Sequence, residues 1–155
     1  SKTICNGCDY ANKMRELEGK IQPKCPFCRH PLPKSEEEGN RNLMKRVEVN
    51  DPAAIRHMGG KRYGEGDYDG AFEYWTKAAG LGNAHSHYQL SVMYREGKDI
   101  EKDEKKEVYN LEEAAIAGHP DARYNLAVDE WENERFDRSA KHFIIAANLG
   151  HDGSI

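Results

Sequence analysis

Three pairs of adjacent alanines, each with a large apolar residue three positions earlier, recur in the second half of the chain. The pairs are Ala78–Ala79, Ala114–Ala115 and Ala146–Ala147, and the large residues are Trp75, Leu111 and Phe143. The pairs follow one another after 36 and then 32 residues, a period typical of stacked helix-turn-helix units. Small side chains let helices approach closely, and the large residue fills the groove between layers. The pattern predicts a mostly α protein, with an α-solenoid of about three helix-turn-helix repeats over residues 50–155.

A second motif marks the first helix of each predicted repeat. Tyr88-Gln89-Leu90 recurs as Tyr124-Asn125-Leu126, and Arg56-His57-Met58 is a degenerate copy. Asp51 followed by Pro52 is typical of a helix start, and the glycine after each alanine pair is suited to the left-handed conformation that ends a helix. The second repeat has a long loop over residues 96–103, whereas the loops of the first and third repeats are shorter.

A linker helix is predicted between this array and the N-terminal segment. Ser35 with Glu38 three residues later forms a capping box, and Leu43, Met44 and Val47 give a partial apolar stripe. Gly39 weakens the helix. We therefore expect residues 34–49 to form a linker with a helix over residues 35–48, and a flexible acidic linker is the alternative.

The charge distribution supports a division into two modules. The chain has 155 residues and a net charge of −4, with 32% charged and 37% hydrophobic residues. Residues 1–48 contain ten lysines and arginines against seven acidic residues, whereas residues 49–155 contain thirteen against twenty. An extended basic footprint for nucleic acid is absent. No apolar run reaches the roughly 18 residues that a membrane span needs.

All four cysteines lie in the first 28 residues as two Cys-x2-Cys pairs, Cys5 with Cys8 and Cys25 with Cys28. Sixteen residues separate the pairs, a spacing that predicts a Zn²⁺ site because each tight turn points two thiolates at one tetrahedral ion. Clustered cysteines also indicate a reducing compartment, which is the cytoplasm or nucleus. Free or redox-active thiols are the alternative interpretation.

The residues around the cysteines resemble the C-terminal half of an all-cysteine RING-type zinc finger. Cys25-Pro26-Phe27-Cys28-Arg29, followed by Pro31-Leu32-Pro33, is similar to the last ligand pair, and Lys2–Cys8 is similar to the middle of the finger. Tyr10, Met14 and Leu17 share a helical face where a RING finger has its central helix. The resemblance implies a partial RING module over residues 1–33. It also implies two zinc ions in a crossed arrangement, with their remaining ligands upstream of Ser1.

A RING finger implies ubiquitin transfer through a ubiquitin-conjugating enzyme, without a covalent intermediate on the finger itself. Pro26 and Phe27 match the apolar contact with that enzyme, and Arg29 matches a cation that bridges enzyme and ubiquitin. Asn12 stands where many RING fingers carry tryptophan. An adaptor with a purely structural zinc site is therefore the alternative. A ribbon with one zinc ion that contacts nucleic acid is the third hypothesis.

The array resembles the Sel-1-like repeat, a relative of the tetratricopeptide repeat. The second copy has Ser91 for the usual glycine and Ile100 for the usual valine, followed by Asp103. The resemblance implies that the repeats bind a protein partner. No paired carboxylates, nucleophile elbow or phosphate loop are found, so no small-molecule substrate is expected.

Several side chains of the repeats have individual expectations. The spacing favours core positions for four aromatic residues, Tyr63, Trp75, Tyr94 and Trp131. Two acidic pairs, Glu112–Glu113 and Asp129–Glu130, are interpreted as solvated faces. His119 and His151 each follow a repeat-ending glycine and are expected in turns. His85 and His87 are two residues apart and cannot share a helix face for a metal ion.

Overall fold

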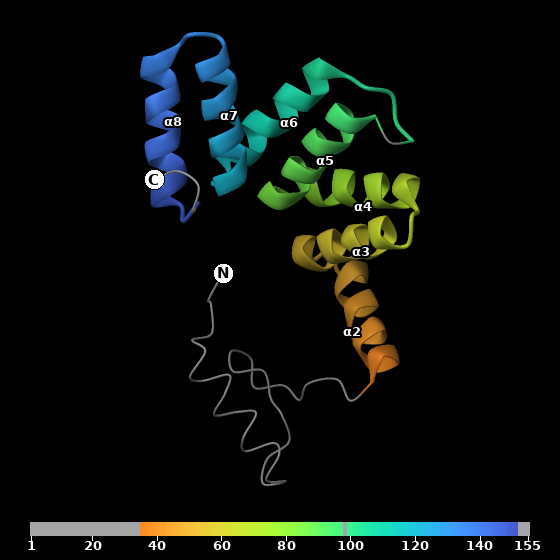
Figure 1. Ribbon diagram of the computed structural model, residues 1–155. Helices are drawn as coiled ribbons and strands as arrows, with labels where there is room; N and C mark the ends of the chain where they lie inside the picture. Colours follow the sequence, from red (N-terminus) through yellow and green to blue (C-terminus); the bar gives the residue numbers. More distant parts are fainter. Residues whose placement is uncertain (1–34, 98, 152–155) are drawn as a thin grey trace, which may run out of the picture. The chain divides into compact units, whose positions relative to one another are not determined.

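The computed structural model describes residues 35–97 and 99–151, and the cysteine-rich segment lies outside them. The chain divides into two compact units, Ser1–Asn42 and Leu43–Ile155. The described residues form seven α-helices and no strand (Figure 1). The helices are α2 (Glu36–Glu48), α3 (Pro52–Gly64), α4 (Tyr68–Gly80), α5 (Ala84–Glu96), α6 (Glu104–Ile116), α7 (Pro120–Glu132) and α8 (Phe136–Asn148).

Helices α3 to α8 form three helix hairpins that stack in chain order. Helix α3 packs on α4, α5 on α6, and α7 on α8, while α4 contacts α5 and α6 contacts α7 (Figure 1). The predicted α-solenoid of three repeats is therefore confirmed. The long loop is also where the sequence predicts it, between Glu96 of α5 and Glu104 of α6.

Short polar side chains and glycines set the helix ends. Asp51 accepts hydrogen bonds from the Ala53 and Ala54 amides at 2.9 and 3.3 Å and so begins α3, in the manner of an N-cap. Asp67, Asn83 and Asp103 cap α4, α5 and α6 in the same way. The glycine after each alanine pair has a positive φ, at Gly82, Gly118 and Gly150. The predicted left-handed helix terminators are thus present.

The alanine pairs lie inside the stack. One buried cluster joins Leu111, Ala114 and Ala115 of α6 to Ala122 of α7, with Tyr88 and Leu126 packed against it. A second joins Trp75, Ala79 and Leu90 with Ala71 and Met93, and Ile100 of the long loop packs against it. Because methyl side chains occupy the contacts, neighbouring hairpins pack closely. The periodic small residues therefore set the hairpin spacing.

The C-terminal end of α2 belongs to the second unit. Val47 is buried with Ile55 and Met58 of α3, and Leu43 packs against the same cluster. The Arg46 guanidinium lies 2.8 Å from the Asp51 carboxylate. At the other end of α2, the Ser35 hydroxyl accepts a hydrogen bond from the Glu38 amide at 3.2 Å, which is one half of the predicted capping box.

Two expectations about individual residues are wrong. Trp131 is 58% exposed and meets Phe136 edge to face with ring centroids 4.9 Å apart. Arg95 occupies the equivalent position of α5 and is also exposed, so this position faces solvent in both repeats. Glu130 is 8% exposed because it pairs with Arg135 and with Arg138. The two arginines compensate the charge of the Glu130 carboxylate, which the sequence pattern predicts on a solvated face.

Trp75 packs against α3 where Gly59 leaves room for the indole. The Trp75 ring is 3% exposed, and its Nε1–H donates a hydrogen bond to the Arg56 carbonyl at 3.2 Å. A Cβ atom built at Gly59 would lie 2.4 Å from Trp75 Cδ1. Such a contact is far inside van der Waals distance, so this packing requires glycine at position 59.

We predict that Gly59→Ala destabilises the protein by roughly 1–3 kcal/mol, the usual cost of overpacking. Gly60→Ala is the matched control in the same helix, because a Cβ there meets nothing within 4 Å. It should stabilise the helix by about 0.5–1 kcal/mol. Urea unfolding followed by circular dichroism measures both effects. Equal effects of the two substitutions would show that the Trp75 contact does not limit position 59.

Candidate functional site

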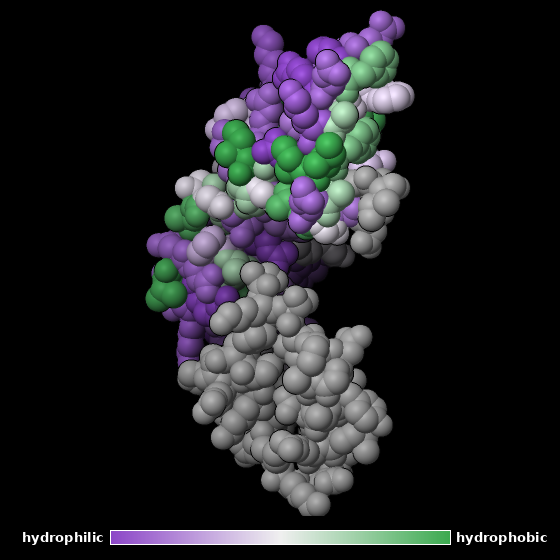
Figure 2. Space-filling model, turned by 90° about the vertical axis from the view of Figure 1, so that its left-hand side faces the viewer, coloured by the Kyte–Doolittle hydropathy of each residue, from purple (hydrophilic) through white to green (hydrophobic). Residues whose placement is uncertain are grey.

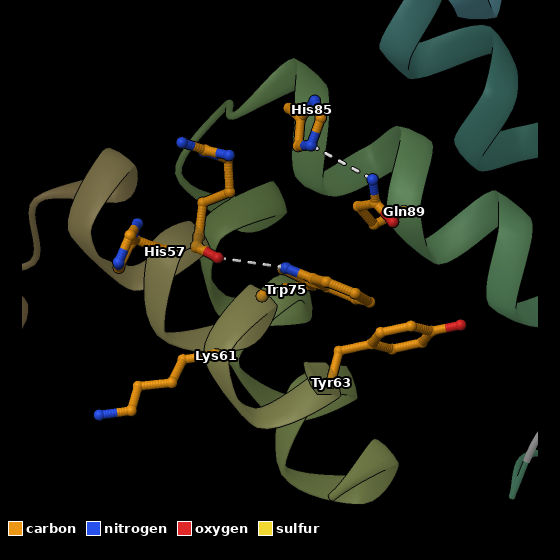
Figure 3. Close-up of a pocket in the computed structure, with 8 residues that line it drawn as sticks. His57, Lys61, Tyr63, Trp75, His85 and Gln89 are labelled. Carbon is orange, nitrogen blue, oxygen red and sulfur yellow. Dashed lines mark hydrogen bonds between the residues drawn. The ribbon is translucent and has the colours of Figure 1, made fainter. Parts of the chain in front are cut away.

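A pocket lies between the first and second hairpins, with a volume of about 440 Å³ (Figure 3). Five of its lining residues come from α3, one from α4 and two from α5. They are Arg56, His57, Gly60, Lys61, Tyr63, Trp75, His85 and Gln89. We call this site the Arg56 pocket. The helical repeat brings Arg56, Gly60 and Tyr63 to one face of α3.

Aromatic rings form one side of the Arg56 pocket. The Tyr63 and Trp75 ring centroids are 5.4 Å apart, and Tyr63 also meets Tyr68 edge to face at 4.9 Å. Figure 3 shows the Tyr63 and Trp75 rings together, with His57 and Lys61 projecting from α3 on the opposite side. Because buried contacts hold Trp75 in place, this side of the pocket is a rigid apolar surface.

The pocket carries positive charge and no acidic lining residue. Arg56 and Lys61 supply the permanent charges. Burial lowers the pKa of His85, and the positive charge of Arg56 lowers it further, whereas Asp121 opposes both effects. The His85 ring is therefore a hydrogen-bonding group at neutral pH, and not a third cation.

His85 also begins a hydrogen-bonded chain that links the second and third hairpins. His119 is the N-cap of α7, where its Nδ1 accepts the Ala122 amide hydrogen at 3.4 Å. The proton of neutral His119 is then on Nε2, which lies 3.0 Å from Nδ1 of His85 and donates to it. His85 Nε2 carries the next proton and lies 3.2 Å from the Gln89 amide nitrogen. A half-turn of the Gln89 side-chain amide exchanges its nitrogen and oxygen, so that the oxygen accepts the His85 Nε2 proton.

A histidine–tyrosine ring stack occurs in two successive repeats. The His119 ring stacks on Tyr88 with centroids 4.5 Å apart, and the His151 ring stacks on Tyr124 at 4.3 Å. His151 Nε2 also lies 3.5 Å from an Asp121 carboxylate oxygen. A histidine after the repeat-ending glycine therefore packs on the tyrosine of the preceding first helix. The sequence contains this signal, because in both copies the histidine directly follows the repeat-ending glycine and the tyrosine is the first residue of a Tyr-x-Leu motif.

The structure does not test the metal and partner residues expected from the sequence. Cys5, Cys8, Cys25 and Cys28 lie outside the described residues, as do the expected partner contacts Pro26, Phe27 and Arg29. Within residues 35–97 and 99–151, no group of three histidines, cysteines or acidic residues could hold a metal ion. No helix in this part of the chain is long and apolar enough to cross a membrane.

Apolar side chains are exposed on the last hairpin. Figure 2 shows hydrophobic side chains among hydrophilic ones on the face that includes this end of the array. The exposed large residues of α8 are Phe136, Ile144 and Ile145, and Leu149 follows them. Nothing in the described residues covers them, and they are separate from the Arg56 pocket.

Comparison with solved structures defines the class of this fold. A Sel1 repeat protein from Oxalobacter formigenes is similar over 75% of this chain and 93% of its own, with 25% identity and a TM-score of 0.65. A protective antigen of uropathogenic Escherichia coli that displays an SLR fold has 24% identity and a TM-score of 0.65, over 77% of this chain and 27% of its own. Helicobacter pylori cysteine rich protein B has 18% identity and a TM-score of 0.60, over 76% and 90%.

The array is accordingly an α-solenoid with the fold of Sel1-like repeat proteins. No family model matches the sequence, and no curated protein matches it. The match to solved structures thus supports the Sel-1-like part of the expectation from the sequence.

We predict that the protein loses stability as the pH falls through about 6.5. Burial lowers the pKa values of His85, His119 and His142 from their ordinary value of 6.5. The unfolded chain then binds more protons than the folded one, so the free energy of unfolding decreases as the pH falls and levels off below the folded pKa values. Thermal unfolding between pH 7.5 and pH 5 should show a fall in Tm on the order of a few degrees.

The variant His119→Asn isolates the contribution of His119 to the pH dependence of stability from the contributions of the other histidines. Asparagine already caps α5, where Asn83 Oδ1 accepts the Ser86 amide hydrogen at 2.9 Å. The variant should therefore keep the α7 cap and lose part of the pH dependence. A pH profile that runs parallel to the wild-type profile would exclude a contribution from His119.

Proposed function

We propose that the repeat array is a protein-interaction scaffold. The stack of helix hairpins is the observation that supports this function, because such arrays present extended surfaces and perform no chemistry themselves. The similar solved structures include the Sel1 repeat protein from Oxalobacter formigenes, and Sel1-like repeats bind protein partners. The Arg56 pocket is a recessed site of the size at which a partner side chain could anchor.

We further propose that residues 1–33 are a RING-type module and that the protein is a ubiquitin ligase. The cysteine donors fit Zn²⁺, because thiolates suit a borderline-soft ion. In the crossed arrangement of a RING finger, Cys5 and Cys8 would bind one ion, and Cys25 and Cys28 would bind the other. Bound zinc would hold this short segment together, since the segment contains too little apolar surface for a core of its own. Such a site requires a reducing compartment, which supports a cytoplasmic or nuclear location.

In this proposal the two modules have different tasks. Pro26 and Phe27 would contact a ubiquitin-conjugating enzyme, and Arg29 would bridge that enzyme and the ubiquitin attached to it. The finger supplies no nucleophile and acts by holding the thioester in a reactive orientation. The repeats would hold the substrate on the same chain, which raises its effective concentration near the thioester.

A non-catalytic adaptor is the second candidate function. Asn12 favours it, because many RING fingers have tryptophan at the corresponding position of the surface that contacts the conjugating enzyme. In an adaptor the zinc site would be structural, and the repeats would be the sole binding surface. Measured zinc content together with ubiquitin transfer distinguishes the two functions.

We predict that the protein binds Zn²⁺ and forms ubiquitin chains with a conjugating enzyme. Arg29→Ala should keep the zinc and reduce chain formation by about tenfold, as expected when a charge-assisted contact is lost. Arg15→Ala is the matched control, since it removes the same charge from the same segment. Elemental analysis and a reconstituted assay with several conjugating enzymes measure both properties. Zinc binding without chain formation would support the adaptor, and absence of zinc would exclude both zinc-dependent functions.

We also predict that partner binding requires the folded array. Leu111 is fully buried in α6, so Leu111→Ala should cost roughly 2–5 kcal/mol and abolish the capture of partners from cells. Ile116→Ala on the same helix is the control, because Ile116 is 72% exposed and should change stability by less than about 0.5 kcal/mol. Quantitative affinity purification compares the two variants with the wild type. If the wild type enriches no protein, the scaffold function is wrong.

A further inference from the structure

We propose that the Arg56 pocket binds an acidic peptide segment, with a carboxylate seated against the Arg56 guanidinium. The proposal rests on the scaffold function above and names the chemistry of the partner. Three observations support it: a departure from the repeat pattern that opens the pocket, an arginine without an ion-pair partner in the described chain, and the local confinement of positive charge.

Two of the positions at which the first hairpin departs from the other repeats account for the pocket. Tyr88 and Tyr124 occupy the position of Arg56, and Val92 and Val128 occupy that of Gly60. At the next junction the ring of Tyr88 is covered by His119 at 4.5 Å. In the first hairpin a long cation replaces the ring and a hydrogen replaces the valine side chain. A cavity of about 440 Å³ remains, with room for an incoming side chain.

Arg56 differs from most other arginines of the second unit in its partners. Those with a carboxylate partner are Arg46, Arg62, Arg95, Arg135 and Arg138. Arg56 forms no ion pair with any residue within 35–97 and 99–151, although its carbonyl accepts the Trp75 hydrogen bond. The neighbouring groups on α5 are His85 and Gln89, which bond to each other. A bidentate carboxylate is the partner that a guanidinium fork matches best.

The charge distribution favours a peptide over a nucleic acid. Residues 49–155 carry thirteen basic and twenty acidic residues, so a long polyanion would be repelled by most of the array. The positive charge of Arg56 and Lys61 is confined to one recess. That recess suits one or two carboxylates on a short segment, and the adjacent Tyr63 ring offers a surface for an apolar or aromatic neighbour.

The two tryptophans give a direct binding test by NMR. The probe is a capped peptide, Gly-Glu-Glu-Tyr-Glu-Gly, and its counterpart with glutamine in place of glutamate is the comparison. The glutamate peptide should shift the indole N–H signal of Trp75, which lies at the pocket, and leave that of Trp131 unchanged. Its affinity should exceed that of the glutamine peptide by about tenfold, the usual effect of a charge-assisted hydrogen bond. Equal affinity of the two peptides overturns the proposal.

Variants locate the site and keep the test independent of folding. Arg56→Gln should weaken glutamate-peptide binding by about tenfold. Lys141→Gln removes one charge from an exposed position on α8 and should weaken it by less than about twofold. Arg56→Tyr should stay folded, because tyrosine occupies this position in both other repeats, and should abolish the Trp75 shift. Equal losses in Arg56→Gln and Lys141→Gln would mean non-specific attraction and overturn the proposal.

A nucleic-acid probe and partner capture complete the design. If single-stranded oligothymidylate shifts the Trp75 signal more strongly than the glutamate peptide does, the pocket recognises a polyanion and the peptide proposal is wrong. Affinity purification with Arg56→Tyr separates this inference from the scaffold function. Loss of specific partners supports the pocket. If Arg56→Tyr captures the same partners as the wild type, and if the glutamate peptide does not shift the Trp75 signal of the wild type, the pocket proposal is overturned and the scaffold function stays in place.

Discussion

Close approach of neighbouring helices is the constraint on which the rest of this structure depends. Ala79, Ala114 and Ala115 are buried in clusters that join neighbouring hairpins, whereas Ala78 is buried against α3 within the first hairpin. The larger residue three positions earlier fills the space beside each pair. A bulkier side chain at any of these alanines would push the packed helices apart, because protein interiors are close-packed. Gly59 is the extreme case, since the indole of Trp75 occupies the volume of its missing side chain. Small residues therefore determine where large ones can lie.

Repetition gives the array its core, and departures from repetition give it a site. Where the copies agree, as at the alanine pairs, the small residues lie at helix contacts, and five of the six are buried. Where the first copy differs, with Arg56 for tyrosine and Gly60 for valine, the same backbone encloses a cavity with a positively charged wall. A repeat protein can acquire a binding site in this way without changing its fold, because each hairpin contacts only its neighbours.

The sequence predicts most of the fold because the relevant signals are local or periodic. Asp51 with Pro52 predicts a helix start, and the glycines after the alanine pairs predict helix ends. Burial at individual positions is harder to predict, since Trp131 occupies a position that is exposed in the preceding repeat as well, where the residue is Arg95. Glu130 is buried because two arginines from the following turn and helix converge on it. The sequence shows how many charged residues are present, but it does not show that these two arginines meet at Glu130.

The site was less predictable than the fold for a geometric reason. His85 and His119 are on different hairpins, and only stacking brings their ring nitrogens to 3.0 Å. His85 is then shared by two environments, since it lines the Arg56 pocket and also receives a hydrogen bond from the cap of α7. Protonation of His119 at Nδ1 would remove the acceptor for the Ala122 amide and place a positive charge beside His85. The pocket and the junction between the second and third hairpins are therefore coupled through a single imidazole, and the charge state of one affects the other.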